Sequence, residues 1–334
     1  MKVFITGGTG FIGSRLAIAS REKGHAVVLL GQTNTQAERE NHQLLQKHGI
    51  ETTLGSVLEK DKLIELAKDC DIVFHLAAAQ HEANVPDEHF YKVNVEGTRH
   101  MLEASVQGGV RRFVHGSTIG VYGSAMEGEI DEDTPLRPNN IYGVTKREGE
   151  QLALSFDEKL PVSVVRISET YGPGDRRLLK LFKAIQKNVF FVIGKGDNKH
   201  QLIYVDDLID GMYLAANDAK ATGQVFVLAG KEVLTTREMV DTIADCLETR
   251  IRRLHAPMLP FLTAAVVLEK TLGPLGIQPP LHRRRLDFFR KSFFFSQEKA
   301  ASVLGFSPKT DFRRGVAQTA AWYREQGLLQ SRQT

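Results

Sequence analysis

The chain has 334 residues, 42% of them hydrophobic and 25% charged, which is enough for one large α/β unit or for two lobes sharing a cleft. Its 43 basic and 40 acidic residues leave a net charge of +3, too balanced to favour nucleic acid as a partner. The isolated Cys70 and Cys246 have no metal-ligand spacing, so we expect neither a disulfide framework nor a metal site.

Nothing in the sequence predicts a membrane span. The first apolar run ends in glycines after a few residues, so it does not resemble a signal peptide. The longest largely apolar run, Ala256–Leu268, is 13 residues long and contains two prolines. A transmembrane helix needs roughly 20 residues. We therefore expect no transmembrane segment and a cytoplasmic location.

The first thirteen residues carry the most informative motif. Lys2–Thr6 is typical of a buried parallel strand, and Gly7, Gly10 and Gly13 separate it from a predicted helix, Ser14–Lys23. Gly7 allows a tight turn, Gly10 lets the backbone approach a pyrophosphate, and Gly13 allows the helix to pack closely on the strand. The N-terminus of the helix adds free N–H groups and partial positive charge. This turn predicts a dinucleotide site.

Short apolar runs and amphipathic segments alternate along the first half of the chain. The further predicted strands are Ala26–Leu30, Glu51–Leu54, Ile72–Leu76, Arg112–Ser117 and Val162–Ile167. The longer predicted helices are Glu88–Gln107 and Tyr142–Glu158. This order predicts an α/β fold of Rossmann type, a doubly wound parallel sheet with helices on both faces.

After Ile167 the alternation changes. Predicted helices at Arg177–Asn188 and Thr235–Leu247 lie on either side of a predicted strand, Gln224–Leu228, and a proline-punctuated C-terminal third follows. We expect residues 1–168 to form the dinucleotide-binding domain, with 200–230 returning to it. Residues 169–199 and 231–334 are then a smaller C-terminal substrate-binding lobe over the carboxyl edge of the sheet.

Tyr142 and Lys146 stand one turn apart in YGVTK, at the start of a predicted helix. An ammonium group beside a phenol lowers the phenol pKa from its usual value of about 10. Such a tyrosine can accept a proton from a secondary alcohol while hydride leaves the carbon. A hydroxyl at the end of the preceding strand, on Ser117 or Thr118, can hydrogen-bond the same substrate oxygen.

These motifs resemble the extended short-chain dehydrogenase/reductases, a superfamily of NAD(P)-dependent sugar epimerases, dehydratases and hydroxysteroid dehydrogenases. The matches span most of the chain: TGGTGFIG (6–13), HLAA (75–78), VNVEGT (93–98), STIGVYG (117–123), YGVTK (142–146), YGPGD (171–175), YVDDL (204–208) and LGFSP (304–308). The resemblance implies that Thr118, Tyr142 and Lys146 are catalytic, with Ser117 as the alternative hydroxyl. Asn94 matches an asparagine near cofactor and substrate, although a purely structural role stays open.

The resemblance also implies a cofactor site. Its residues are Gly7, Gly10, Phe11, Ile12, Gly13, Leu76, Ala77, Ala78 and Lys146. Members that prefer NAD carry an acidic residue at the end of the second strand, where this chain has Gly31. The family's Gly-Asp pair near the adenine is Gly55-Ser56 here. The cofactor is thus NAD(P), and the missing carboxylate favours NADP slightly.

The substrate positions depart from nucleotide-sugar epimerases. Those enzymes commonly have an asparagine and a phosphate-binding arginine where this chain has Glu169 and His200. Both changes disfavour a diphosphate. The dehydratases carry an Asp-Glu pair where Ile119-Gly120 stands, which argues against 4,6-dehydration.

The C-terminal third is apolar and basic. Residues 257–268 and 272–281 resemble the corresponding region of 3β-hydroxysteroid-dehydrogenase-like members and suit an apolar substrate, although packing on the lobe or on a second subunit of a homodimer is the alternative. The run around Arg283–Arg285 can be a phosphate clamp, a membrane-surface patch or a solvated face.

Together these features predict an NAD(P)-dependent oxidoreductase that exchanges hydride between nicotinamide and a small-molecule secondary alcohol or ketone, with an apolar, hydroxysteroid-like substrate. A nucleotide-sugar epimerase with bound NAD is the alternative. A non-catalytic dinucleotide sensor is a further alternative, which the intact Thr118, Tyr142 and Lys146 disfavour.

Overall fold

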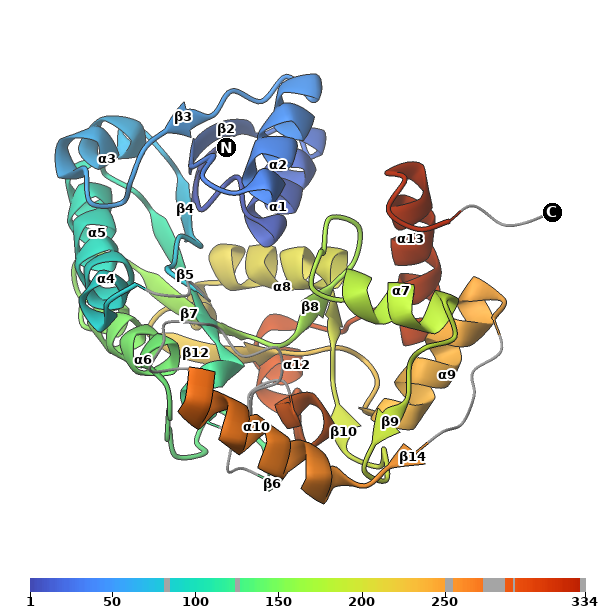
Figure 1. Ribbon diagram of the computed structural model, residues 1–334. Helices are drawn as coiled ribbons and strands as arrows, with labels where there is room; N and C mark the ends of the chain where they lie inside the picture. Colours follow the sequence, from blue (N-terminus) through green and yellow to red (C-terminus); the bar gives the residue numbers. More distant parts are fainter. Residues whose placement is uncertain (81–84, 124–126, 250–254, 273–285, 291, 331–334) are drawn as a thin grey trace.

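The computed structural model describes residues 1–80, 85–123, 127–249, 255–272, 286–290 and 292–330, and a seven-stranded sheet forms its centre (Figure 1). The strand order is β12-β7-β5-β4-β1-β2-β3, and every neighbouring pair is parallel. The strands are β1 (Lys2–Thr6), β2 (Ala26–Gly31), β3 (Thr53–Leu54), β4 (Ile72–His75), β5 (Arg112–Thr118), β7 (Val162–Ile167) and β12 (Gln224–Leu228). The order reverses between β1 and β4, which is where ligands of open α/β sheets bind.

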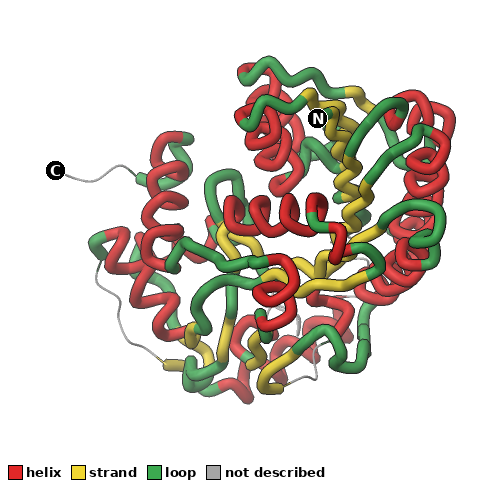
Figure 2. The backbone as a smooth tube through the Cα atoms, turned by 180° about the vertical axis from the view of Figure 1, so that it is seen from behind, coloured by secondary structure: helices red, strands yellow, loops and turns green. Residues whose placement is uncertain are grey.

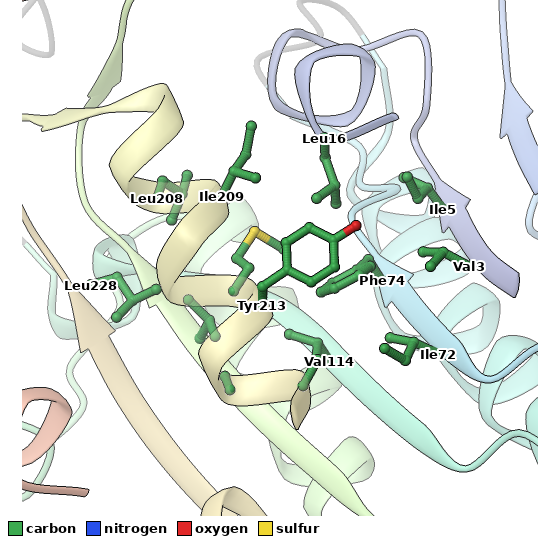
Figure 3. Packing of buried hydrophobic residues seen from close by; sticks show 14 of the residues in the cluster. Val3, Ile5, Leu16, Ile72, Phe74, Val114, Leu208, Ile209, Tyr213 and Leu228 are labelled. Atoms are coloured by element: carbon green, nitrogen blue, oxygen red, sulfur yellow. The ribbon is translucent and has the colours of Figure 1, made fainter. Parts of the chain in front are cut away.

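Helices cover both faces of this sheet (Figure 2). One layer contains α1 (Phe11–Glu22), α2 (Gln36–Lys47), α8 (Val205–Asn217) and α12 (Glu298–Leu304). The opposite layer contains α3 (Lys60–Ala67), α4 (Asp87–Tyr91), α5 (Gly97–Gln107) and α6 (Ile141–Leu154). In the first layer Leu16 of α1 and Tyr213 of α8 pack on Phe74 of β4 (Figure 3). The predicted doubly wound Rossmann-type sheet is therefore confirmed.

The remaining elements gather beside the carboxyl ends of the strands. Helices α7 (Leu179–Gln186), α9 (Thr236–Leu247) and α13 (Phe312–Glu325) share a core that includes Phe182, Ile243 and Tyr323. Four short two-stranded pairs complete this region: β8 (Thr170–Tyr171) with β11 (Ile203–Tyr204), β10 (Lys199–His200) with β13 (Leu234–Thr235), β9 (Val192–Ile193) with β14 (His255–Ala256), and β6 (Glu127–Ile130) with β15 (Ser292–Phe295).

Most predicted strands are present, but the predicted helix Glu88–Gln107 is not one α-helix. A π-helical turn, Lys92–Glu96, separates α4 from α5. π-Turns are short and frequently lie at functional sites. Asn94 lies in this turn, and its buried side chain gives the turn a role described below.

The apolar C-terminal segment contains α10 (Met258–Leu272). Among the residues that the structure describes, no helix is long and apolar enough to cross a membrane. The rest of the apolar segment, 273–281, and Arg283–Arg285 lie outside the described residues.

Candidate active site

The glycine turn lies against the loop that follows β4. A Cβ on Gly7, whose φ is +68°, would lie 2.8 Å from the amide nitrogen of Ala77, and a Cβ on Gly13 would lie 2.2 Å from the carbonyl oxygen of Gly7. Both positions therefore require glycine. A Cβ on Gly10 would have a single neighbour within 4 Å, the Gly7 carbonyl oxygen at 3.1 Å. Gly10 thus presents bare backbone to the space outside the turn, as a bound pyrophosphate requires.

The other predicted cofactor residues lie at the same edge. Leu76, Ala77 and Ala78 continue from β4 and are half-buried. Phe11 and Ile12 begin α1 and are also half-buried. The Phe11 ring lies close to Gly174 of the YGPGD loop, because a Cβ there would approach its Cδ2 within 3.1 Å. The predicted cofactor residues are therefore neighbours in the fold.

A chain of buried hydrogen bonds fixes the ends of β1 and β4. The Ala77 N–H donates to Thr6 Oγ1 over 3.2 Å, and Thr6 Oγ1 lies 2.8 Å from His75 Nδ1. On the other side of the ring, His75 Nε2 lies 3.0 Å from Thr98 Oγ1, which donates to the Asn94 carbonyl. Burial is the main cause that lowers the pKa of His75 to about 3, with the Lys146 charge second. The imidazole is thus a neutral bridge between Thr6 and Thr98.

Asn94 connects the π-helical turn to two parts of the site. Its Oδ1 accepts a hydrogen bond from the Ala79 N–H over 2.8 Å, and its Nδ2 donates to Thr145 Oγ1 over 2.9 Å. Ala79 follows the predicted cofactor residues, and Thr145 is next to Lys146. The side chain is buried, so this bridge orients both loop and helix from inside the protein. These hydrogen bonds therefore support a structural role for Asn94, which the sequence left open.

Two of the predicted catalytic residues, Thr118 and Tyr142, come together around Gly120. The Asn140 side chain accepts from the Gly143 N–H and caps α6, which places Tyr142 in the first turn of that helix. A Cβ on Gly120 would lie 3.4 Å from Thr118 Oγ1 and 3.9 Å from Tyr142 Cε1. Both side chains are half-buried, and Thr118 Oγ1 also accepts from the Gly120 N–H over 3.0 Å.

Lys146 lies one turn further along α6 and is buried. Its Nζ donates to the Gly116 carbonyl over 2.6 Å and lies 3.5 Å from His115 Nε2. Burial lowers the pKa of Lys146 to about 8, while the Glu150 carboxylate acts in the opposite direction. Burial also holds the pKa of His115 well below its ordinary value, so this ring is a neutral neighbour. The ammonium form of Lys146 predominates below about pH 8.

Ser117 has a different environment from Thr118. Its Oγ is buried and donates to Glu150 Oε2 over 2.8 Å. Glu150 also receives the guanidinium of Arg166, with Nη2 to Oε1 at 2.5 Å and Nε to Oε2 at 3.2 Å. The Arg166 Nη1 in turn donates to the Tyr122 hydroxyl over 2.7 Å. This geometry favours Thr118 as the substrate-facing hydroxyl, and it commits Arg166 to an internal ion pair.

Sequence reasoning missed the pair between Glu150 and Arg166. The signal was available: an arginine in the otherwise buried strand Val162–Ile167 needs an opposite charge, and Glu150 stands one turn beyond Lys146 on α6. The pair lies directly behind Ser117, at the end of the strand that carries Thr118.

The end of β2 is occupied by Thr9. A Cβ on Gly31 would lie 2.6 Å from Thr9 Cγ2 and 2.7 Å from Thr9 Oγ1. Thr9 is buried, and its Oγ1 accepts from the Gln32 N–H over 3.0 Å. NAD-preferring members carry a carboxylate at this position. This chain lacks it, and the Thr9 side chain occupies the space that it would need.

This packing makes a defined prediction for cofactor selectivity. Gly31→Asp alone should destabilise the turn, whereas Gly31→Asp with Thr9→Ala removes the obstructing methyl and hydroxyl groups. The double variant should bind NAD more tightly relative to NADP, by about tenfold, because a carboxylate bonds the ribose hydroxyls and repels a 2′-phosphate. Calorimetric titration with both dinucleotides measures the ratio, with Thr9→Ala as the control. An unchanged ratio would mean that the ribose is recognised elsewhere.

Glu169 and His200, the two unusual substrate positions, lie near each other. Glu169 Oε2 is 3.8 Å from His200 Nδ1, and the Glu169 side chain is 53% exposed whereas that of His200 is 6% exposed. His200 Nε2 lies 2.8 Å from Thr236 Oγ1 and 3.0 Å from Asn198 Nδ2. The Phe288 ring lies 4.8 Å from the imidazole, centroid to centroid. The imidazole is thus buried, while the Glu169 carboxylate beside it lies at the protein surface.

Gly10→Val tests whether the glycine turn binds a dinucleotide. The backbone of Gly10 has φ −70°, which valine adopts, and the one neighbour of an added Cβ is the Gly7 carbonyl oxygen, a tight contact at 3.1 Å that a small shift relieves. The variant should fold, yet its branched side chain fills the space that the pyrophosphate needs. We expect NAD affinity to fall by at least about tenfold. Calorimetry checks this, with Gly10→Ala as a smaller step, and undiminished affinity in the folded valine variant would make the turn purely structural.

The sheet, the glycine turn and the Tyr142–Lys146 helix define an extended short-chain dehydrogenase/reductase. The chain belongs to the NAD dependent epimerase/dehydratase family, whose model matches residues 3–229. Among curated proteins it is 28% identical to "dTDP-glucose 4,6-dehydratase" of Streptomyces antibioticus, over 97% of this chain and 93% of that protein. It is 27% identical to "3beta-hydroxysteroid-dehydrogenase/decarboxylase isoform 2" of Arabidopsis thaliana, over 78% of this chain and 50% of that protein.

Among solved structures, the chain is similar to "MoeE5 in complex with UDP-glucose and NAD". The TM-score is 0.75 and the identity 26%, over 98% of this chain and 99% of that one. The predicted superfamily and the prediction of an enzyme are both confirmed by these comparisons.

Proposed function

We propose that this protein catalyses NAD-dependent hydride transfer at a secondary alcohol carbon of a nucleotide sugar. The observation that carries the chemistry is the approach of Thr118 and Tyr142 to Gly120, with the buried Lys146 bound to the Gly116 carbonyl of β5. Residues 1–168 and 200–230 form the cofactor part in this proposal, and residues 169–199 and 231–334 form the substrate lobe.

In this mechanism Tyr142 accepts the hydroxyl proton as hydride leaves the carbon, and Thr118 Oγ1 hydrogen-bonds the same oxygen. A bound NAD would supply the hydride acceptor. Lys146 supplies a buried positive charge that favours the phenolate form of Tyr142. The Gly7–Gly13 turn and the N-terminus of α1 receive the pyrophosphate, and Leu76, Ala77 and Ala78 line the adenosine side.

We infer NAD as the cofactor. MoeE5 is described with NAD, and the preference for NADP suggested by Gly31 receives no support from the comparisons. Because Thr9 fills the position beside Gly31, the adenosine ribose must be held by groups other than a β2 carboxylate.

The nucleotide-sugar class is supported by the relatives that match the full chain, the dehydratase from Streptomyces antibioticus and MoeE5 with UDP-glucose. They favour the nucleotide-sugar alternative over the hydroxysteroid-like substrate that the sequence suggested first. Dehydration itself is disfavoured, because the short 3₁₀ helix after Thr118, residues 119–122, begins with Ile119 and Gly120 and offers no carboxylate there. Epimerisation or net oxidation remains as the reaction class.

An apolar hydroxy or keto substrate is the second candidate. Glu169 and His200 put a carboxylate and a buried imidazole ring where a diphosphate would favour an amide and a guanidinium. Arg166 cannot act as a substitute clamp, because Glu150 already binds its guanidinium. The 3beta-hydroxysteroid-dehydrogenase/decarboxylase relative shows that the similarity extends to such enzymes.

Titration with UDP and dTDP separates the two candidates. If the substrate is a nucleotide sugar, the wild-type protein should bind one of them with roughly micromolar affinity. Glu169→Asn should then strengthen binding severalfold, because it removes a carboxylate that repels the diphosphate, and Glu22→Asn is the matched control on an exposed surface. Glu169→Asn with His200→Arg should strengthen it further. Failure of wild type and both Glu169 variants to bind either nucleotide would overturn the nucleotide-sugar assignment in favour of the apolar substrate.

A further inference from the structure

Helix α10 turns an uncharged face to solvent. It runs along the outside of the molecule (Figure 1), and Ala265 is its one fully buried residue. A surface helix normally presents charged and polar side chains to water. The exposed positions of α10 from its start to Val267 are instead Leu259, Pro260, Thr263, Ala264 and Val267. These exposed apolar side chains do not stabilise the fold, and the proposed hydride transfer does not use them.

A second segment extends this uncharged surface. Val189 and Phe191 precede β9, β9 pairs with β14 immediately before α10, and the Phe191 ring lies 5.8 Å from the Phe261 ring of α10. Leu259, Val189 and Val267 are 69%, 65% and 58% exposed, the highest values for large hydrophobic side chains in the described part of the chain. We call Val189, Phe191, Leu259, Pro260, Ala264 and Val267 the apolar edge.

Positive charge is concentrated in the stretch of sequence that contains Val189 and Phe191. Residues 178–199 include five lysines and one acidic residue, and Lys183, Lys187 and Lys195 are exposed. This stretch therefore carries a net charge of +4, whereas the whole chain carries +3. The excess of positive charge is thus local to the segment beside α10.

We propose that the apolar edge docks on the surface of an anionic lipid bilayer. An interfacial helix places apolar side chains at the boundary of headgroups and acyl chains, and flanking cations are attracted to anionic lipid. Leu259 and Val267 provide the apolar contacts on α10, and Val189 and Phe191 widen them. Lys187 and Lys195 flank the segment that carries Val189 and Phe191 and face the headgroups.

The charge distribution argues against two other partners. In a twofold dimer the same patch faces itself, so the lysines of one copy would lie close to those of the other and repel them. Nucleic acid would satisfy the cations but would leave the aliphatic side chains of the apolar edge in water. An anionic lipid surface can both bind the lysines and bury the apolar side chains.

Vesicle cosedimentation of the full chain tests this proposal. Wild-type protein should bind vesicles of phosphatidylcholine with about 30% phosphatidylglycerol at least tenfold more tightly than phosphatidylcholine alone, and high salt should weaken the binding. Leu259→Glu with Val267→Glu should reduce binding by at least about tenfold, because it places two carboxylates in the apolar edge. Both positions are exposed, so the fold should be retained.

The matched control is Val106→Glu with Gln107→Glu, which adds the same charge at an exposed end of α5 and should bind nearly as wild type. Lys187→Glu with Lys195→Glu should abolish the preference for anionic lipid. Equal binding by the Leu259/Val267 variant and wild type would overturn the proposal, as would absence of wild-type binding to the anionic vesicles. A wild-type dimer that the Leu259/Val267 variant dissociates, without vesicle binding, would assign the apolar edge to a subunit interface instead. None of these outcomes depends on the proposed substrate.

Discussion

Replacing Tyr142 with phenylalanine should lower kcat by roughly 10²–10⁴-fold, the usual contribution of one general acid or base. The substitution removes the transferable proton and leaves the ring in place at the start of α6. Because the phenol contributes to the chemical step and the glycine turn to cofactor affinity, the dissociation constant for NAD should change little. Single-turnover kinetics and calorimetry measure the two effects separately.

Tyr91→Phe is the matched control, since Tyr91 is 37% exposed and ends α4. It should leave both kcat and NAD affinity unchanged. A Tyr142→Phe enzyme with near-wild-type kcat would contradict the mechanism, and loss of NAD binding in that variant would show that Tyr142 holds the cofactor rather than the proton.

The sheet was predictable because its strands are short, buried and bounded by turns. Lys2–Thr6, Val162–Ile167 and Gln224–Leu228 have the predicted bounds. Continuous apolar runs identify strands buried on both faces, and alternation with helices identifies a parallel sheet. Helical periodicity did not reveal the π-turn at Lys92–Glu96, because five residues are too few to show a period of their own.

The small pairs outside the sheet were not predictable from local sequence. β15 pairs with β6 although the strands are far apart in the chain, and each has only four residues. Their partners are selected by the tertiary fold rather than by their own propensity.

At the candidate site, motif spacing predicted the individual residues better than their partners. Tyr142 and Lys146 share a helix, so their relation follows from a spacing of four. Ser117 and Thr118 are adjacent, and only the position of Glu150 shows that Ser117 turns into the protein. The contact of Glu169 with His200 joins positions on either side of β9, and local periodicity contains no information about it.

Removing Glu150 should cause the largest loss of stability among the changes considered for this site. Arg166 and Glu150 side chains are 5% and 3% exposed, and they share two hydrogen bonds. In Glu150→Ala the guanidinium stays buried without its counter-charge, which typically costs about 3–5 kcal/mol of unfolding free energy. The Ser117 hydroxyl loses its acceptor as well, so the end of β5 beside Thr118 should loosen.

Denaturant unfolding measures this loss, and an exposed ion pair provides the control. Arg313 and Asp245 lie 2.7 Å apart with side chains 64% and 59% exposed, so Asp245→Ala should cost at most about 1 kcal/mol. Glu150→Leu with Arg166→Met should recover much of the stability lost in Glu150→Ala, because both charges leave the interior together. If Glu150→Ala unfolds at the same denaturant concentration as Asp245→Ala, water or another group must satisfy Arg166. The pair would then not hold the end of β5, and the position of Thr118 would depend on its hydrogen bond from the Gly120 N–H alone.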